Sequence, residues 1–356
     1  MIEIVVIGGG AAGMMAAITA ARQGGQVTLL EPNERLGKKL NITGKGRCNV
    51  TNDCDQETLM ANIPGNGRFL YSALTRFTPQ DTMAFFEGLG VPLKVERGNR
   101  VFPVSDRSFD ISGALERELR RLHVRWVRDR AREITVQDGH VTGVQGEKQH
   151  YPASAVVLAT GADPRTLGVA GETELLGRGV AYCAACDGMF YKGKTVVVVG
   201  GGNSAAADAL LLSRVAKKVI LVHRRDTLRA TKIYHEPLAQ AENVEFRWNS
   251  VVSALLSGDR LTGVRLRDTV TGEESVVDCD GVFVSVGRQP ATALAVGQLA
   301  LDGGGYIVAG ETTETSIPGV YAVGDVRTKP LRQVVTAVAD GAVAVHMAEK
   351  YIAENR

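Results

Sequence analysis

Two cysteines separated by two residues form the clearest chemical signal in this chain. The stretch AYCAACDGMF, residues 181–190, places Cys183 and Cys186 in a CxxC spacing, and Asp187 follows directly. Such a pair could bind zinc, form a structural disulfide, or open and close as a redox pair. A zinc site needs four ligands, and the sequence offers no second CxxC or histidine pair at a suitable spacing. The pattern therefore disfavours the metal and leaves the two disulfide alternatives open.

A glycine-rich loop near the start of the chain predicts a first dinucleotide site. The stretch IEIVVIGGGAAG joins an apolar strand to a G-x-G-x-x-G turn, and a helix and a second strand follow. This is a complete dinucleotide-binding βαβ unit, in which the helix N-terminus faces the phosphates. The loop residues that we assign to the cofactor are Gly8, Gly10, Ala12 and Gly13.

A second unit of the same kind follows in KTVVVVGGGNSAAADALLLSRVAKKVILVHRRD. The first unit ends its second strand in Glu31, 23 positions after its first glycine, whereas the second unit has His223 at that spacing. A carboxylate there binds a free ribose diol, while arginines there attract a 2′-phosphate. The first site should therefore hold FAD or NAD and the second NADPH, although a solvated basic turn remains an alternative. The assigned residues of the second site are Gly200, Gly202, Asn203, Ser204, His223, Arg224, Arg225 and Arg229.

The composition fits a chain of two α/β domains. The 356 residues exceed one ordinary core, and the hydrophobic and charged fractions of 44% and 22% are typical of globular proteins. A net charge of +2 gives no sign of a nucleic-acid or membrane-surface partner. Glu3 and the early glycine loop argue against a signal or membrane anchor. The five sparse cysteines are not a disulfide scaffold, so we expect a cytoplasmic protein.

Two further segments resemble the flavoproteins with two dinucleotide-binding folds. They are TSIPGVYAVGD, residues 315–325, and AVVLATGA, residues 155–162. The resemblance implies that the first site holds FAD and that the last helix points its N-terminus at the flavin. It assigns to FAD the residues Ala131, Thr160, Gly161, Gly324, Asp325, Arg332, Gln333 and Val334.

From about residue 155 onward the chain resembles the low-molecular-weight thioredoxin reductases. The matching stretches include GRGVAYCAACDGMFYKGK, VHRRDTLRA, FVSVGRQP and RQVVTAVADGAVA. The resemblance implies that Cys183–Cys186 is a redox disulfide in the NADPH domain, with Cys186 nearer the flavin and Asp187 as the general acid. It also implies a thioredoxin-like partner, a homodimer, and rotation of the NADPH domain between two states.

The first 155 residues resemble a different group, the bacterial NAD(P)/FAD-dependent oxidoreductases with a GKGRCN motif. The resemblance rests on GKKLNITGKGRCNVTND, residues 37–53, and on GNRVFPVSDRS. In that group the motif lies against FAD, which adds Gly37, Lys38 and Gly44 to the cofactor residues. The whole chain therefore looks like a hybrid or chimera of the two groups.

These observations predict an NADPH-binding domain inserted into a discontinuous FAD-binding domain, both Rossmann-like. We expect the FAD domain at residues 1–165 and 288–356, and the NADPH domain at 166–287, with two short strands at the crossings. Residues 111–122 should form an amphipathic helix, and the stretches 124–129 and 131–146 should form antiparallel strands with a turn at Asp138-Gly139.

The leading functional hypothesis is an NADPH-dependent flavin disulfide reductase that acts on a thioredoxin-like protein. An alternative is an FAD protein with NADPH oxidase or diaphorase activity but no thioredoxin reduction, and a third is a folded FAD scaffold without activity. Cys48 and Cys54 are expected to be free thiols and Cys279 a core residue.

Overall fold

The computed structural model describes residues 2–41, 46–63 and 66–355. It divides into two compact units, Met1–Ala162 with Pro290–Arg356 and Asp163–Gln289. Gly44, one of the residues expected at FAD, lies outside the described residues. No helix within the described ranges is long and apolar enough to cross a lipid bilayer.

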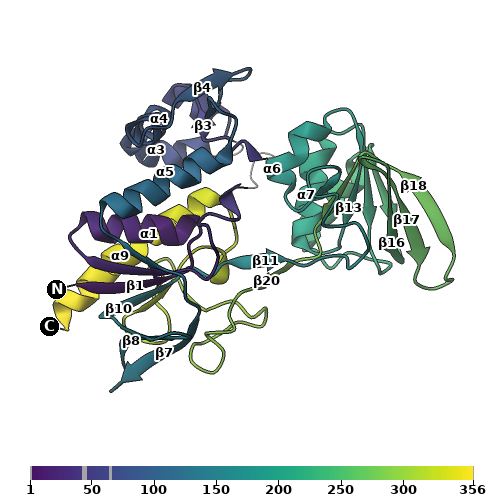
Figure 1. Ribbon diagram of the computed structural model, residues 1–356. Helices are drawn as coiled ribbons and strands as arrows, with labels where there is room; N and C mark the ends of the chain where they lie inside the picture. Colours follow the sequence, from purple (N-terminus) through teal and green to yellow (C-terminus); the bar gives the residue numbers. More distant parts are fainter. Residues whose placement is uncertain (1, 42–45, 64–65, 356) are drawn as a thin grey trace. The chain divides into compact units, whose positions relative to one another are not determined.

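The first unit is built on a five-stranded parallel sheet (Figure 1). Every neighbouring pair of strands in this sheet is parallel, as expected for a dinucleotide-binding fold. The strands, in spatial order, are β21 (Val320–Ala322), β10 (Ala155–Leu158), β1 (Glu3–Ile7), β2 (Gln26–Leu30) and β6 (Arg125–Val127).

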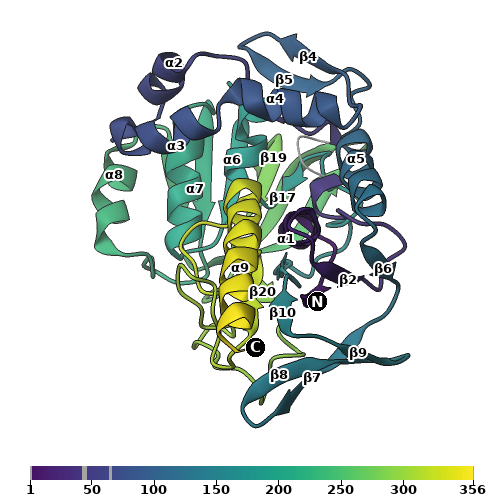
Figure 2. The same cartoon turned by 90° about the vertical axis from the view of Figure 1, so that its left-hand side faces the viewer.

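Three helices cover one face of this sheet, and an antiparallel sheet lies on the other. The helices pack on the buried side chains of Ile4, Val6 and Leu29, which alternate along their strands with residues of the opposite face. Figure 2 shows α9 beside α1, and in this view α1 is seen nearly along its axis. The helices are α1 (Ala11–Arg22), α5 (Ser108–Arg121) and α9 (Val334–Glu354), and the antiparallel strands are β7 (Ala131–Gln137), β8 (His140–Gly146) and β9 (His150–Pro152).

The helix expected at residues 111–122 is confirmed as α5, which begins three residues earlier, at Ser108. The hairpin with its turn at Asp138-Gly139 is confirmed as β7 and β8. The expectation that residues 124–129 would pair antiparallel is wrong, because β6 pairs in parallel with β2. The physical reason is the preceding helix α5, which returns the chain along the sheet in the same direction, as in a crossover connection.

A smaller antiparallel sheet and short helices lie between β2 and α5 in the sequence. The helix α4 begins with a capping box, in which Thr78 and Asp81 satisfy each other's backbone amides. The elements are β3 (Thr51–Asn52), α2 (Gln56–Ala61), η2 (Gly67–Leu70), α3 (Tyr71–Arg76), α4 (Pro79–Gly88), β4 (Leu93–Glu96) and β5 (Arg100–Pro103).

The second unit has its own five-stranded parallel sheet with helices on one face and an antiparallel sheet on the other. In spatial order the parallel strands are β12 (Val180–Ala181), β19 (Gly281–Val284), β13 (Thr195–Val199), β14 (Lys218–Val222) and β15 (Val244–Arg247). The helices are α6 (Ala184–Asp187), η3 (Gly188–Tyr191), α7 (Asn203–Ser213), η4 (Lys232–Tyr234) and α8 (His235–Gln240), and the antiparallel strands are β16 (Ser250–Ser257), β17 (Leu261–Asp268) and β18 (Glu274–Asp278).

The two places where the chain passes from one unit to the other form a pair of short strands, as expected. These strands are β11 (Ala162–Pro164) and β20 (Arg288–Pro290), and they pair in a two-stranded sheet.

Candidate active site

The first nucleotide loop joins β1 to α1 with almost no spare space. Gly8 has φ of 108°, a conformation that favours glycine, and its amide donates to the carbonyl of Leu30 at 2.8 Å. A Cβ atom on Gly13 would lie 1.9 Å from the carbonyl oxygen of Gly8, so the helix approaches the turn too closely for any side chain there. Gly10 caps α1 and Ala12 lies in its first turn. The loop thus leaves backbone amides at the helix N-terminus for an anion.

Glu31 folds back over this loop. Its Oε2 accepts a hydrogen bond from the amide of Gly9 at 2.8 Å, and its Oε1 accepts one from the amide of Asn33 at 2.9 Å. The side chain of Glu31 is 9% exposed, so its carboxylate is held in place beside the phosphate loop. This is the placement that hydrogen bonding to a ribose diol requires.

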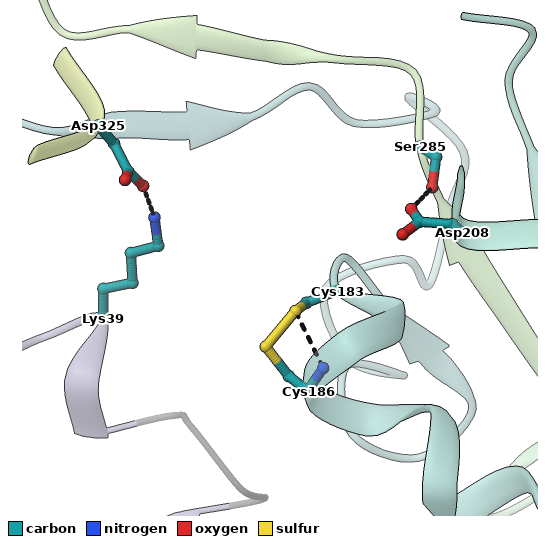
Figure 3. The surroundings of a disulfide bond; sticks show 6 residues. All are labelled: Lys39, Cys183, Cys186, Asp208, Ser285 and Asp325. Atoms are coloured by element: carbon teal, nitrogen blue, oxygen red, sulfur yellow. Dashed lines mark hydrogen bonds and ion pairs between the residues drawn. A yellow bond between two sulfur atoms is a disulfide. The ribbon is translucent and has the colours of Figure 1, made fainter. Parts of the chain in front are cut away.

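The segment after Glu31 returns to the same loop. The amide of Gly37 donates to the carbonyl of Gly9 at 2.8 Å, and Lys38 is exposed. The adjacent Lys39 forms an ion pair with Asp325, which the sequence separates from it by 286 positions (Figure 3). Lys39 is not among the site residues expected from the sequence, because no local sequence pattern reveals a contact between residues so far apart in the chain.

Asp325 lies in the 3₁₀ turn η5 (Gly324–Val326), directly after β21. The turn is buried, and the carboxylate of Asp340 on α9 accepts a hydrogen bond from the Gly324 amide at 2.8 Å. Arg332 stacks over the ring of Tyr306, with 4.0 Å between its guanidinium carbon and the ring centre. This segment therefore runs from the end of the parallel sheet to the start of the last helix.

The remaining residues expected at FAD lie in the first unit as well. The hydroxyl of Thr160 donates to the carbonyl of Ala291, Gly161 has φ of 78°, and half-buried Ala131 begins β7. Gln333 caps α9, which starts at Val334. Thr160 and Gly161 follow β10, and Asp325 follows β21. Because these strands are parallel to β1, both groups lie at the carboxyl ends of the strands, where the glycine loop also lies.

The second nucleotide loop repeats the geometry of the first. Gly200 has φ of 146°, its amide donates to the carbonyl of Val222 at 3.0 Å, and Gly202 caps α7. Asn203 accepts a hydrogen bond from the amide of Thr231 through its Oδ1, and Ser204 is exposed. The two loops therefore present equivalent backbone positions in the two units.

His223 takes the place in the second loop that Glu31 has in the first. A Cβ atom on Gly201 would lie 2.2 Å from the His223 ring, which is 4% exposed. Burial lowers the pKa of His223, and the positive charges of Arg229, Arg225 and Arg224 lower it further. The imidazole is therefore neutral near pH 7 and packs against the loop.

The three arginines beside His223 are exposed at the end of β14. The amide of Arg229 donates to the carbonyl of Gly201 at 2.7 Å, which ties the basic segment to the phosphate loop. In the described part of the chain, no carboxylate pairs with Arg224, Arg225 or Arg229. An unpaired guanidinium cluster beside a dinucleotide loop fits a 2′-phosphate, which accepts bidentate hydrogen bonds.

Cys183 and Cys186 form a disulfide at the start of α6, with 5.3 Å between their Cα atoms (Figure 3). Cys183 caps the helix, and its sulfur accepts a hydrogen bond from the amide of Cys186 at 3.1 Å. Cys186 is exposed and Cys183 is half-buried, so the pair can be reached from outside this unit. Asp187 ends α6, and burial together with the charge of Asp187 raises the pKa of Tyr191 to about 12.

A carboxylate that the sequence did not reveal lies on α7. Asp208 accepts a hydrogen bond from the hydroxyl of Ser285 at 2.5 Å (Figure 3). Ser285 follows β19, whose neighbour β13 leads into the glycine loop, so this pair lies at the point where the strand order reverses. Ligands of open α/β sheets bind at that point. Burial raises the pKa of Asp208, against the opposing effects of Ser285 and Arg288.

The other cysteines lie away from the disulfide in the sequence. Cys54 is a free thiol, as expected, and Cys279 is a buried core residue, as expected. Burial raises the pKa of Cys279 to about 12. Burial also raises the pKa of Cys54, and the negative charges of Asp55 and Asp53 raise it further. Both thiols are therefore poor nucleophiles at pH 7. Cys48 is buried with φ of 60°.

Comparison with known proteins identifies the family. Residues 2–341 match the family model of pyridine nucleotide-disulphide oxidoreductases. A thioredoxin reductase from Peptoclostridium acidaminophilum is 34% identical over 359 aligned positions, which cover 99% of this chain and 98% of that protein. A thioredoxin reductase from Listeria monocytogenes is 49% identical, but that alignment spans 57% of this chain and only 64% of the relative.

Solved structures give the same result. The thioredoxin reductase of Streptococcus pyogenes has a TM-score of 0.75 at 32% identity, and the alignment covers 99% of this chain and 98% of that one. The enzyme from Giardia duodenalis has the same TM-score at 25% identity, with 99% and 100% of the two chains covered.

These full-length matches do not support the expectation of a hybrid chain, because relatives of one kind align with both the first 155 residues and the rest. The family uses FAD and NADPH, and the two loops fit them: the Glu31 carboxylate marks the first and an exposed arginine cluster marks the second. The chain belongs to the pyridine nucleotide-disulphide oxidoreductases and, within them, to the thioredoxin reductase family.

Proposed function

We propose that this chain is an NADPH-dependent flavin disulfide reductase that reduces a thioredoxin-like protein. The observation that carries the proposal is the Cys183–Cys186 disulfide, which shares one compact unit with a nucleotide loop and its arginine cluster. When bound, NADPH supplies a hydride and FAD accepts it and passes the electrons to a disulfide.

The cofactor assignments follow from the two loops. The first unit would hold FAD through Gly8, Gly10 and Gly13, with Glu31 on the adenosine ribose and Asp325 at the other end of the cofactor. The second unit would hold NADPH on the backbone amides that follow Gly202, with the 2′-phosphate on Arg224, Arg225 and Arg229. On this basis the two units are an FAD-binding and an NADPH-binding domain.

The thiol pair would act by exchange once its disulfide is reduced. Cys183 as thiolate attacks the disulfide of the partner protein, which forms a mixed disulfide and displaces one partner thiolate. Cys186 then attacks the Cys183 sulfur, which restores the intramolecular disulfide and releases the second partner thiolate. Asp187, the last residue of α6, supplies a proton to the departing thiolate.

The paired crossing strands β11 and β20 support a hinge between the two domains, about which the NADPH domain turns during the cycle. The proposal also includes a homodimer and a cytoplasmic location, where the thiols needed for exchange stay reduced.

Anaerobic titration with NADPH, followed by addition of thioredoxin and a colorimetric thiol reagent, tests the function. NADPH should bleach the flavin absorbance, and thioredoxin should then give continuous thiol release. Cys183→Ser should keep the bleaching and lower thiol release by more than about 10³-fold, because the exchange step is lost. Cys54→Ser, which changes a free thiol, is the matched control and should leave both unchanged.

Two outcomes would reject the proposal. Bleaching without thiol release in the unaltered protein would indicate an NADPH oxidase or diaphorase. Bound FAD that NADPH does not bleach would indicate a flavin-binding scaffold without activity.

A further inference from the structure

A cluster of buried charges supports the turn that carries Asp325. The carboxylate of Asp340 accepts the Gly324 amide at 2.8 Å, the Arg327 guanidinium at 2.8 and 2.9 Å, and the Lys329 ammonium at 2.7 Å. The side chains of Arg327 and Lys329 are each 5% exposed and that of Asp340 is 9% exposed. The cluster is therefore closed from water and hydrogen-bonded to the backbone of the turn.

The cluster holds one more positive charge than negative. Two cations share the single carboxylate of Asp340, and their other hydrogen bonds go to neutral carbonyls, including Ala309 for Arg327 and Thr336 for Lys329. The adjacent carboxylate of Asp325 already pairs with Lys39. Across the described ranges, neither cluster cation pairs with a second carboxylate.

An uncompensated charge without water is costly, so its presence calls for an anion or a functional role. Burial raises the pKa of Asp340, but the hydrogen bonds from Arg327, Lys329 and Gly324 outweigh it and lower the pKa below the usual value. Asp340 is therefore ionised at pH 7, and the surplus of one positive charge persists.

We propose that this cluster positions the Gly324–Asp325 turn for FAD and that its surplus positive charge raises the reduction potential of the bound flavin. The inference rests on the proposed function, since it places FAD at Asp325. A flavin that accepts a hydride gains one negative charge, and a fixed positive charge nearby favours that form. Asp340 and Lys329 are thus positioning residues, which act on the cofactor through the turn and through their charge.

The test compares the reduction potential of FAD in the unaltered holoenzyme and in Lys329→Met, by anaerobic equilibration with a redox dye. The variant should bind FAD and should favour the oxidised form about tenfold more, which is a shift of about 30 mV to lower potential for a two-electron couple. Lys329→Arg keeps the charge and should restore the potential. Lys350→Met, which removes an exposed lysine on α9, the helix that carries Asp340, should have no effect.

Asp340→Asn tests the same inference, and its expected shift of the flavin reduction potential is opposite in sign. It leaves two positive charges in the cluster, so the potential should rise, while the lost support of Gly324 should weaken FAD binding. Circular dichroism shows whether each variant folds, and Lys329→Gln replaces Lys329→Met if that variant does not.

An unchanged potential in folded Lys329→Met or Lys329→Gln, or equal shifts in Lys329→Met and Lys329→Arg, would overturn the inference. Thioredoxin reduction by the unaltered enzyme would meanwhile leave the proposed function standing. A protein that binds FAD but releases no thiols would reject the proposed function, and its flavin potential would still test the cluster.

Discussion

At the scale of single residues, the two nucleotide units differ in charge at the end of their second strand. Glu31 packs on Gly9 and His223 packs on Gly201, so in both units the side chain that follows the second strand contacts the middle glycine of the loop. Glu31 carries a negative charge, whereas His223 is neutral and is followed by exposed arginines. We therefore expect two loops with the same backbone geometry to select different cofactors, because the charge at the end of the second strand differs.

Replacing Arg224 and Arg225 together by alanine should weaken NADPH selectively. Each charge-assisted hydrogen bond to a phosphate contributes about 1.5–3 kcal/mol, so the KM for NADPH should rise by about 10²-fold or more. The KM for NADH should change little, because NADH has no 2′-phosphate. Steady-state kinetics with both nucleotides measures this, and Arg267→Ala, an exposed arginine on β17, is the control. Equal losses for NADH and NADPH would contradict the assignment.

At the scale of elements, two different kinds of contact hold α1 between α9 and α5. A Cβ atom on Gly341 of α9 would lie 2.5 Å from the carbonyl oxygen of Ala12, so the absence of a side chain lets the two helices touch. On the other side, the buried carboxylate of Glu118 in α5 binds Arg22 of α1 at 2.7 Å and Arg121 of its own helix. Close packing and an ion pair therefore fix the helix that begins at the first nucleotide loop.

The ion pair of Glu118 should make stability depend on pH. Hydrogen bonds from Arg121 and Arg22 lower the pKa of Glu118 from 4.5 to about 2, although burial of the carboxylate acts in the opposite direction. Its stabilisation is therefore complete above pH 4.5 and is lost as the pH falls towards 2, and it amounts to at most about 3 kcal/mol. Screening at the exposed guanidinium groups reduces that value.

Urea unfolding of the holoprotein between pH 3 and 6 should show this loss, and Glu118→Gln should flatten the dependence. Glu116→Gln is the control, since within the described ranges Glu116 pairs only with the exposed Arg120 of its own helix. A slope that survives unchanged in Glu118→Gln would assign the acid sensitivity to other carboxylates.

At the scale of the whole molecule, contiguous patterns were predictable from the sequence and long-range contacts were not. Each nucleotide loop, its helix and its two strands lie within 28 residues, Glu3–Leu30 and Thr195–Val222, so their spacing alone predicts the βαβ fold. Asp208 pairs with Ser285 across 77 positions, and Lys39 pairs with Asp325 across 286. Neither pair follows a period or motif, because only the assembled sheet brings its strand ends together.

The direction of β6 and the charges under Asp325 escaped prediction for a related reason. The alternation of residues 124–129 indicates a strand but not its partner, and helix α5 sets the direction. Arg327, Lys329 and Asp340 look like ordinary polar residues in the sequence, since their burial depends on how η5 packs against α9. Local pattern thus predicts elements, while the partners of buried charges follow from tertiary packing.

Two compact units with separate nucleotide loops should respond separately to the two cofactors. A ligand that binds only the folded state at 100 times its Kd stabilises that state by about 2.7 kcal/mol. FAD added to apoprotein should therefore raise the midpoint of one calorimetric transition by several degrees, and NADP⁺ should raise that of another. Arg224→Ala with Arg225→Ala should remove the NADP⁺ shift and keep the FAD shift. If one transition moves with both ligands and stays single in that variant, the units unfold together, and the separate cores of the two sheets do not give them independent stability.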